Sequence, residues 1–160
     1  MITLKDEISS QENMEAWLSQ VGLPDCPISS EGVLAMLKPR FVSCDFEEQS
    51  ACFAFDVYDW ELNPEGNLHG GIISTGFDVS CGLLCHYFAK QRMVSTVTLS
   101  TTYLKPVRPD DTVLYRVKIV SLGHTLVSLT GEAWVKDRNV LAATCTTTFM
   151  ILKKTFAIPV

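Results

Sequence analysis

The chain has 160 residues, of which 47% are hydrophobic and 19% charged, and its net charge is −5 at pH 7. This composition predicts one globular domain with a full-sized core, and the acidic balance argues against binding nucleic acid, which requires a basic field. No apolar run approaches the roughly 20 residues of a membrane span, and the N-terminus lacks the charge order and apolar core of a signal peptide. We therefore expect a cytoplasmic protein that does not contact membranes.

Helical segments are predicted first, and a pair of strands follows them. Residues 5–21 place apolar side chains near helical spacing, which predicts an amphipathic helix. A short helical piece is predicted over 31–37, and Pro39 stops it. Segments 40–47 and 51–58 contain alternating apolar and polar residues with a short turn between them, which predicts a β-hairpin.

The rest of the chain is predicted to form one long helix and then strands. The apolar stretch from His69 to Ala89 favours a buried helix of about five turns, although Gly76 and Gly82 each weaken it by roughly 1 kcal/mol relative to Ala. Strands are predicted over 94–103, 112–122, 125–135 and 140–152. The expected result is an antiparallel sheet of five or six strands with one buried helix, which is the α+β class.

The segment from residue 63 to residue 78 carries the strongest functional signal. A turn rich in Pro, Gly and Asn leads into His69, Gly70 and Gly71 at the start of the predicted helix. Backbone N–H groups at a helix start bind an oxyanion or a phosphate. Asp78 interrupts the apolar run and is a candidate base or nucleophile. Apolar neighbours such as Phe77 predict that Asp78 is enclosed by apolar side chains, which would strengthen it as a base.

The order of elements and this loop resemble the hot-dog fold, in particular its phenylacetate-degradation type of acyl-CoA thioesterase. The residues that stand at the family's spacing are Asn63, Gly66, His69, Gly70, Gly71 and Asp78. The segment Thr101-Thr102-Tyr103-Leu104-Lys105-Pro106 resembles the family's strand exit after the helix. The resemblance covers about residues 40–152. It implies a helical extension over 1–37, a hot-dog domain over 38–153 and a tail over 154–160.

The resemblance implies hydrolysis of an acyl-CoA thioester to a free acid and CoA. Asp78 would be the general base or the nucleophile. The backbone N–H of Gly71, together with that of Gly70, would polarise the thioester carbonyl. Asn63 would orient the attacking water or the carbonyl, and His69 would hold the loop on the oxyanion side.

Two further roles follow from the same resemblance. A hydroxyl near the water would come from Thr96, with Ser95 and Thr98 as neighbouring alternatives. The phosphates of CoA require cations, and Lys105 and Arg108 lie on a turn just beyond the strand that carries Thr96. Other cations near turns or helix ends are Lys90, Arg92, Lys136 and Arg138.

Helix geometry predicts that two chains share the site. Gly70 and Asp78 are eight residues apart, which is roughly 12 Å along one α-helix. A nucleophile and an oxyanion donor must both lie within about 3 Å of the reacting atoms. Two antiparallel copies of the helix satisfy this requirement, so we expect a symmetric homodimer with two equivalent sites. Hot-dog relatives are dimers and often pair into tetramers, so the resemblance also implies a homotetramer.

Two other functions fit the same fold. One is a non-catalytic acyl-CoA-binding module, although binding alone does not require a buried carboxylate. The other is a hydratase, whose usual pairing of Asp with a nearby His fits poorly here, because His69 precedes Asp78 by nine residues.

Metal and cofactor chemistry is not expected. Cys81, Cys85 and His86 lie close in sequence but leave a tetrahedral site incomplete. The six cysteines are scattered through apolar segments, which favours buried free thiols over disulfides. The sequence does not name the acyl group, whose tunnel we expect to depend on side chains such as Phe77, Tyr87 and Phe88.

Overall fold

The computed structural model describes residues 9–23, 25–26 and 29–155. In this part of the chain the helices are α1 (Gln11–Leu18), α2 (Gly32–Leu37), the 3-10 helix η1 (Asp59–Glu61) and α3 (Gly70–Phe88). The strands are β1 (Arg40–Asp45), β2 (Ser50–Asp56), β3 (Arg92–Tyr103), β4 (Thr112–Leu122), β5 (Leu126–Val135) and β6 (Val140–Thr155).

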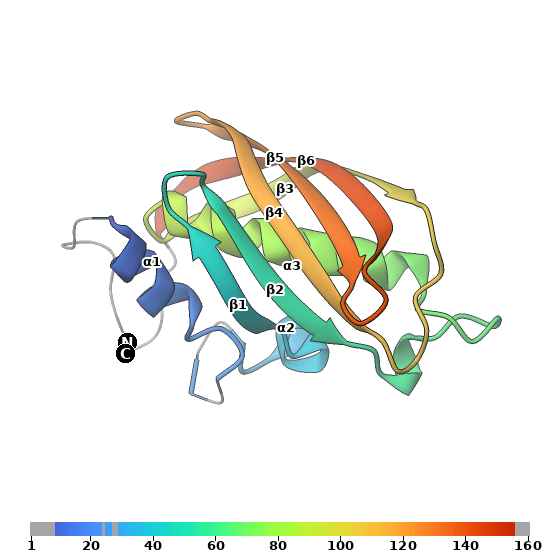
Figure 1. The fold of residues 1–160 in the computed structure, drawn as a ribbon. Coiled ribbons are helices and arrows are strands. Elements are labelled where there is room, and N and C mark those ends of the chain that lie inside the picture. The colour runs from blue at the N-terminus through green and yellow to red at the C-terminus, as the bar shows by residue number, and fades with distance from the viewer. Residues whose placement is uncertain (1–8, 24, 27–28, 156–160) are drawn as a thin grey trace.

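A single antiparallel sheet of these six strands is wrapped around α3, the long green helix in Figure 1. The strand order is β1-β2-β4-β5-β6-β3, so β1 and β3 are the two edges among the described strands. The prediction of an α+β protein with one long buried helix is confirmed.

The core lies between α3 and the concave face of the sheet. Tyr115 on β4 is fully buried, and its ring packs against Phe55 at 4.8 Å and Phe77 at 5.0 Å between centroids. Its hydroxyl donates a hydrogen bond to the carbonyl of Ile73 on α3 at 3.2 Å. These contacts fix the rotation of α3, and therefore decide which of its faces points away from the core.

The N-terminal helix covers one end of this core. Ser10 caps α1, which is eight residues long, so the helix predicted over 5–21 is shorter than expected; residues 5–8 lie outside the described residues. Trp17 packs against Tyr87 near the end of α3, at 5.9 Å between ring centroids. Gln11 donates a hydrogen bond to the carbonyl of Cys44 on β1 at 3.0 Å. The helix therefore joins β1 to the end of α3.

Several boundaries differ from the sequence predictions. β3 begins at Arg92, and β6 continues to Thr155 because these two residues pair at the end of the ladder. The boundary expected at residue 153 therefore falls inside a strand, and 156–160 lie outside the described residues. β2 is buried on both faces, so its pattern is not the predicted alternation. The six cysteines are free. None of the described helices has the length and apolarity needed to cross a bilayer.

Candidate functional site

The first turn of α3 is capped by the side chain of His69. Its Nδ1 accepts a hydrogen bond from the backbone N–H of Gly71 at 2.9 Å, so the neutral ring carries its proton on Nε2. Gly71 was predicted to be the main oxyanion donor, but this N–H is already engaged. The N–H of Gly70 finds no acceptor among the described residues. The geometry therefore favours Gly70 as the donor that remains for a ligand.

The loop before α3 is held by Asn63. Its Oδ1 accepts backbone N–H groups of Glu65 at 3.0 Å and Asn67 at 3.1 Å. The oxygen therefore stabilises the turn, and the amide nitrogen remains as the side chain's donor to a ligand. The loop also joins the core, because the N–H of His69 donates to the carbonyl of Glu61 at 2.9 Å. Burial raises the pKa of the Glu61 carboxyl, and a hydrogen bond from a backbone N–H partly opposes this shift.

A cavity of about 350 Å³ opens in front of this loop. Asn63, Gly70, Tyr103 and Lys105 are among the residues that line it. The hydroxyl of Tyr103 donates to the carbonyl of Gly70 at 2.9 Å and lies 2.6 Å from the hydroxyl of Ser74. Tyr103 thus ties the end of β3 to the first turn of α3.

Asp78 and Thr96 meet at a different place on α3. The Thr96 hydroxyl on β3 donates to Oδ1 of Asp78 at 2.6 Å, and this short contact is typical of a hydrogen bond to a carboxylate. The prediction that apolar side chains enclose Asp78 is wrong for the single chain, because Asp78 is only half-buried. Its neighbours Phe77 and Cys81 point into the core and are fully buried. Side chains at successive positions of an α-helix point in different directions around its axis, so Asp78 does not point into the core with them.

Beside this pair lies a second cavity, of about 310 Å³. Sequence reasoning missed its lining residues on α3, which are Val79, Gly82, Leu83 and His86. The available signal was the helical spacing of Gly82 and His86, which follow Asp78 by four and eight positions and share its face of the helix. The three aromatic residues expected to set the depth do not line it. Phe77 and Tyr87 are buried in the core, and Phe88 stacks on Phe46 at 5.7 Å.

His86 lies in the wall of this second cavity as a neutral ring. Its Nδ1 is 2.9 Å from the carbonyl of Arg92, and because a carbonyl only accepts, Nδ1 carries the proton. Burial lowers the pKa of His86, and the hydrogen bond to this carbonyl opposes the shift only in part. Cys81 and Cys85 do not combine with His86 into a metal site: no cluster of three or more ligand side chains occurs among the described residues.

The predicted cations differ in their surroundings. Lys105 is exposed and lines the cavity with Gly70, whereas Arg108 is exposed but is not among the residues that line it. Neither forms an ion pair within the described part of the chain. Arg138, by contrast, pairs with Asp111 and also donates to the carbonyl of Pro106. Lys105 is therefore the predicted cation that the geometry places beside the loop.

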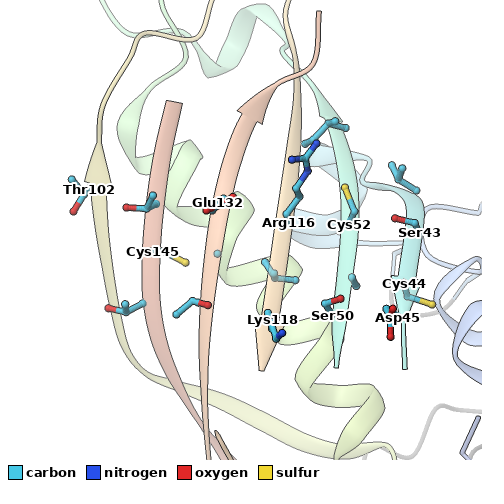
Figure 2. Close-up of a pocket in the computed structure, with 18 of the residues that line it drawn as sticks. Ser43, Cys44, Asp45, Ser50, Cys52, Thr102, Arg116, Lys118, Glu132 and Cys145 are labelled. Carbon is cyan, nitrogen blue, oxygen red and sulfur yellow. The ribbon is translucent and has the colours of Figure 1, made fainter. Parts of the chain in front are cut away.

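A larger groove of about 810 Å³ lies on the face of the sheet opposite α3 (Figure 2). It is lined by residues of all six strands, including Arg116, Lys118 and Glu132, which are exposed on β4 and β5. None of the predicted site residues lines it. The strands of the sheet therefore separate this groove from Asp78 and from the loop before α3.

Comparison with known proteins agrees with the fold and the motif. Residues 65–142 match the thioesterase superfamily model. The acyl-CoA thioester hydrolase YciA of Escherichia coli K12 is 32% identical over 76 residues, which are 48% of this chain and 58% of that protein. The chain thus spans less than two thirds of the length of this curated relative.

Two solved structures share the architecture. A putative thioesterase from Ralstonia eutropha JMP134, described as related to phenylacetic acid degradation, has a TM-score of 0.74 at 23% identity, covering 84% of this chain and 99% of that one. The smu.793 protein of Streptococcus mutans UA159, solved with acetyl CoA, has a TM-score of 0.63 at 27% identity, covering 72% and 91%.

The curved antiparallel sheet and its central helix define a hot-dog fold protein. Together with the matched segment, they confirm the resemblance drawn from the sequence. The chain has the hot-dog fold, its residues 65–142 match the thioesterase superfamily model, and it is similar to the phenylacetate-degradation type.

Proposed function

We propose that this protein is an acyl-CoA thioesterase, which hydrolyses a CoA thioester to a free acid and CoA. The observation that carries the proposal is the hydrogen bond from Thr96 to Asp78, two residues that line a largely apolar cavity. A carboxylate held in this way beside an apolar pocket is suited to act on a substrate with an apolar tail. The names of the relatives support this reading, since one is an acyl-CoA thioester hydrolase and another was solved with acetyl CoA.

The site is divided between two chains in this proposal. Gly70 and Asp78 lie on one continuous helix, roughly 12 Å apart along its axis. The two cavities that contain them share none of the described residues in their linings. Reacting groups must approach within about 3 Å of one another. A second chain that runs antiparallel brings its own Gly70 loop to Asp78 of the first, and the reverse, which gives two equivalent sites.

The edge strand β3 is the surface that supports such a dimer. It is 12 residues long and pairs only with β6 among the described strands. Its exposed apolar residues include Val97, which is 51% exposed, and Met93. A long edge with unpaired backbone groups and apolar side chains readily adds a strand from another chain. We propose that two copies pair along β3, and that such dimers associate further into tetramers.

The chemistry follows from the groups at each half-site. Asp78 takes a proton from water, and the hydroxide attacks the thioester carbonyl. The negative charge that develops on the carbonyl oxygen meets the N–H of Gly70 at the helix start of the partner chain, where donors need no reorganisation. The tetrahedral intermediate then expels the CoA thiolate, which takes up the proton, and leaves the free acid. The hydrogen bond from Thr96 fixes the carboxylate and leaves its second oxygen for the water.

In this proposal the phosphates of CoA bind on the side of the site that contains the loop before α3. Lys105 lines the cavity that contains Gly70 and Asn63, and it is exposed without an ion-pair partner among the described residues. In this arrangement the pantetheine arm enters from the loop and the acyl group continues toward Asp78 of the other chain. Arg108, three residues further along the chain, adds a second exposed cation outside the residues that line the cavity.

Thiol release from a panel of aryl and straight-chain acyl-CoAs tests the proposal. We expect turnover by the wild-type protein and a loss on the order of 10²- to 10⁴-fold with Asp78→Asn, which keeps the shape of the side chain. Thiol release that persists in Asp78→Asn rejects the mechanism. Tight binding of acyl-CoA without any turnover instead identifies a binding module. A monomer by sedimentation rejects the shared site.

A further inference from the structure

The helix α3 contains two glycines whose surroundings differ. At Gly76 an added Cβ would lie 2.7 Å from Cε2 of the buried Tyr115 ring and closer still to Cζ and the hydroxyl oxygen. Core packing therefore requires Gly76. At Gly82 an added Cβ would lie 3.5 and 3.7 Å from ring atoms of Phe149, which is ordinary van der Waals contact. Alanine fits there and is favoured in a helix over glycine, so packing does not explain Gly82.

Gly82 faces the cavity of about 310 Å³ beside Asp78. It follows Asp78 by four residues and therefore lies on the same side of the helix, one turn further from the loop. Any side chain at this position would extend into the cavity toward Phe149. The missing side chain is thus a source of the cavity's volume.

The residues that line this cavity also include Leu34 of α2. This short helix precedes residues 65–142, the segment that matches the superfamily model. Leu34 is half-buried and packs against the hydrophobic core. The N-terminal part of the chain therefore contributes to the same cavity as Gly82.

The lining also restricts the chemistry of an occupant. Among the described residues that line this cavity, Asp78 alone carries a charge, since none of them is Lys or Arg and His86 is neutral. The remaining walls are mostly aliphatic and aromatic, such as Met93 and Phe149. A carboxylate at the end of an acyl chain would enter this cavity with no cation to pair it and with Asp78 nearby. The occupant must therefore be uncharged.

The volume sets the size of that occupant. An apolar cavity of about 150 Å³ holds one benzene molecule. A cavity of about 310 Å³ therefore has room for roughly eight to twelve carbon atoms.

We propose that Gly82 determines the length of the acyl group, and that the substrates are uncharged acyl thioesters of medium length whose far end lies between Gly82 and Leu34. This inference rests on the proposed thioesterase function. It gives Gly82, which has no side chain, a role in specificity. It also makes α2, which precedes the matched segment, part of the wall that contacts the substrate.

The test compares Gly82→Ala, Gly82→Leu and Leu34→Ala with the wild type. Thiol release is measured on straight-chain acyl-CoAs from four to sixteen carbons and on a dicarboxylic thioester of matched length. We expect Gly82→Leu to lower kcat/KM on the longest accepted chain by on the order of tenfold or more, with little change on the four-carbon chain. Gly82→Ala should shift the profile in the same direction by less, and Leu34→Ala should shift it toward longer chains. The dicarboxylic thioester should be a poor substrate.

The outcomes separate this inference from the function on which it rests. An unchanged length profile in both Gly82 variants, with thiol release intact, overturns the role of Gly82 and leaves the thioesterase standing. If no thioester is hydrolysed, the thioesterase proposal fails. The same length series is then measured as binding, by calorimetry on Asp78→Asn with and without Gly82→Ala. A binding profile that Gly82→Ala does not shift overturns the inference in that case also. Gly82→Ala covers the possibility that the leucine variant does not fold, because its methyl group fits without a clash.

Discussion

A divided site can be tested by combining two defective chains. Asp78→Asn removes the base from one half-site. Gly70→Ala places a methyl group 3.3 Å from the Tyr103 ring, in the cavity where the thioester carbonyl would lie, and so blocks the other half-site. Each variant alone has the same defect in both of its sites and should be nearly inactive.

The heterodimer of these two chains has a defined composition. One site combines the altered Asp78 with the altered loop and is inactive. The other combines the native Asp78 of one chain with the native Gly70 loop of its partner. One of two sites is therefore intact, and the heterodimer should recover about half of the wild-type activity.

The assay requires pure heterodimer. The two variants are expressed together with different affinity tags and purified in tandem, and native mass spectrometry verifies the pairing. Thiol release is then compared with that of each variant homodimer and of a wild-type dimer that carries the same two tags. A heterodimer as inactive as its parents would refute the shared site, because a site contained in one chain is defective in both partners.

Three further outcomes follow from the same structure. Gly76→Ala should lower the free energy of unfolding by about 1–3 kcal/mol because its methyl group overlaps the rigid Tyr115 ring; chemical denaturation that shows equal or greater stability contradicts this. Thr96→Val should lower kcat by on the order of tenfold with little change in KM, because it removes the hydrogen bond to Asp78, whereas a rise in KM alone would point to a binding role. Burial lowers the pKa of His86, so the folded state favours the neutral ring, and its contribution to stability is complete above the unfolded pKa of 6.5 and is lost as the pH falls below it. Unfolding free energies measured from about pH 7 to 5.5 should therefore decrease, and His86→Gln should flatten that slope.

The elements with strict periodicity were predictable from the sequence. The strand over 112–122 was placed at its observed bounds, because four alternating apolar residues and flanking turns define it. The helix from His69 was placed within one residue, since its apolar composition leaves no strand alternative. The first helix was not, because its apolar spacing continues to the buried Val21, whereas α1 ends at Leu18.

The residues of the candidate site were named from the sequence and their roles stay predictions, whereas the contacts between them could not be predicted. The sequence named Asp78, Thr96 and the loop, but the hydrogen bond that occupies the N–H of Gly71 depends on the direction of the His69 ring. No sequence pattern specifies that ring direction. The second cavity depends on residues from α2, β3 and β6, which meet α3 only through the tertiary fold.

One strand of this protein holds both halves of the candidate site. β3 carries Thr96, which holds Asp78, and Tyr103, which holds the carbonyl of Gly70. The same strand presents Val97 and an unpaired edge to solvent in the single chain. If two copies pair along this edge, the pairing also fixes the distance between the two half-sites, because both are hydrogen-bonded to the strand that forms the interface. A change in the register of that pairing would then move the carboxylate of one chain relative to the helix start of the other. Activity in the proposed enzyme should therefore depend on the register of the dimer as well as on its formation.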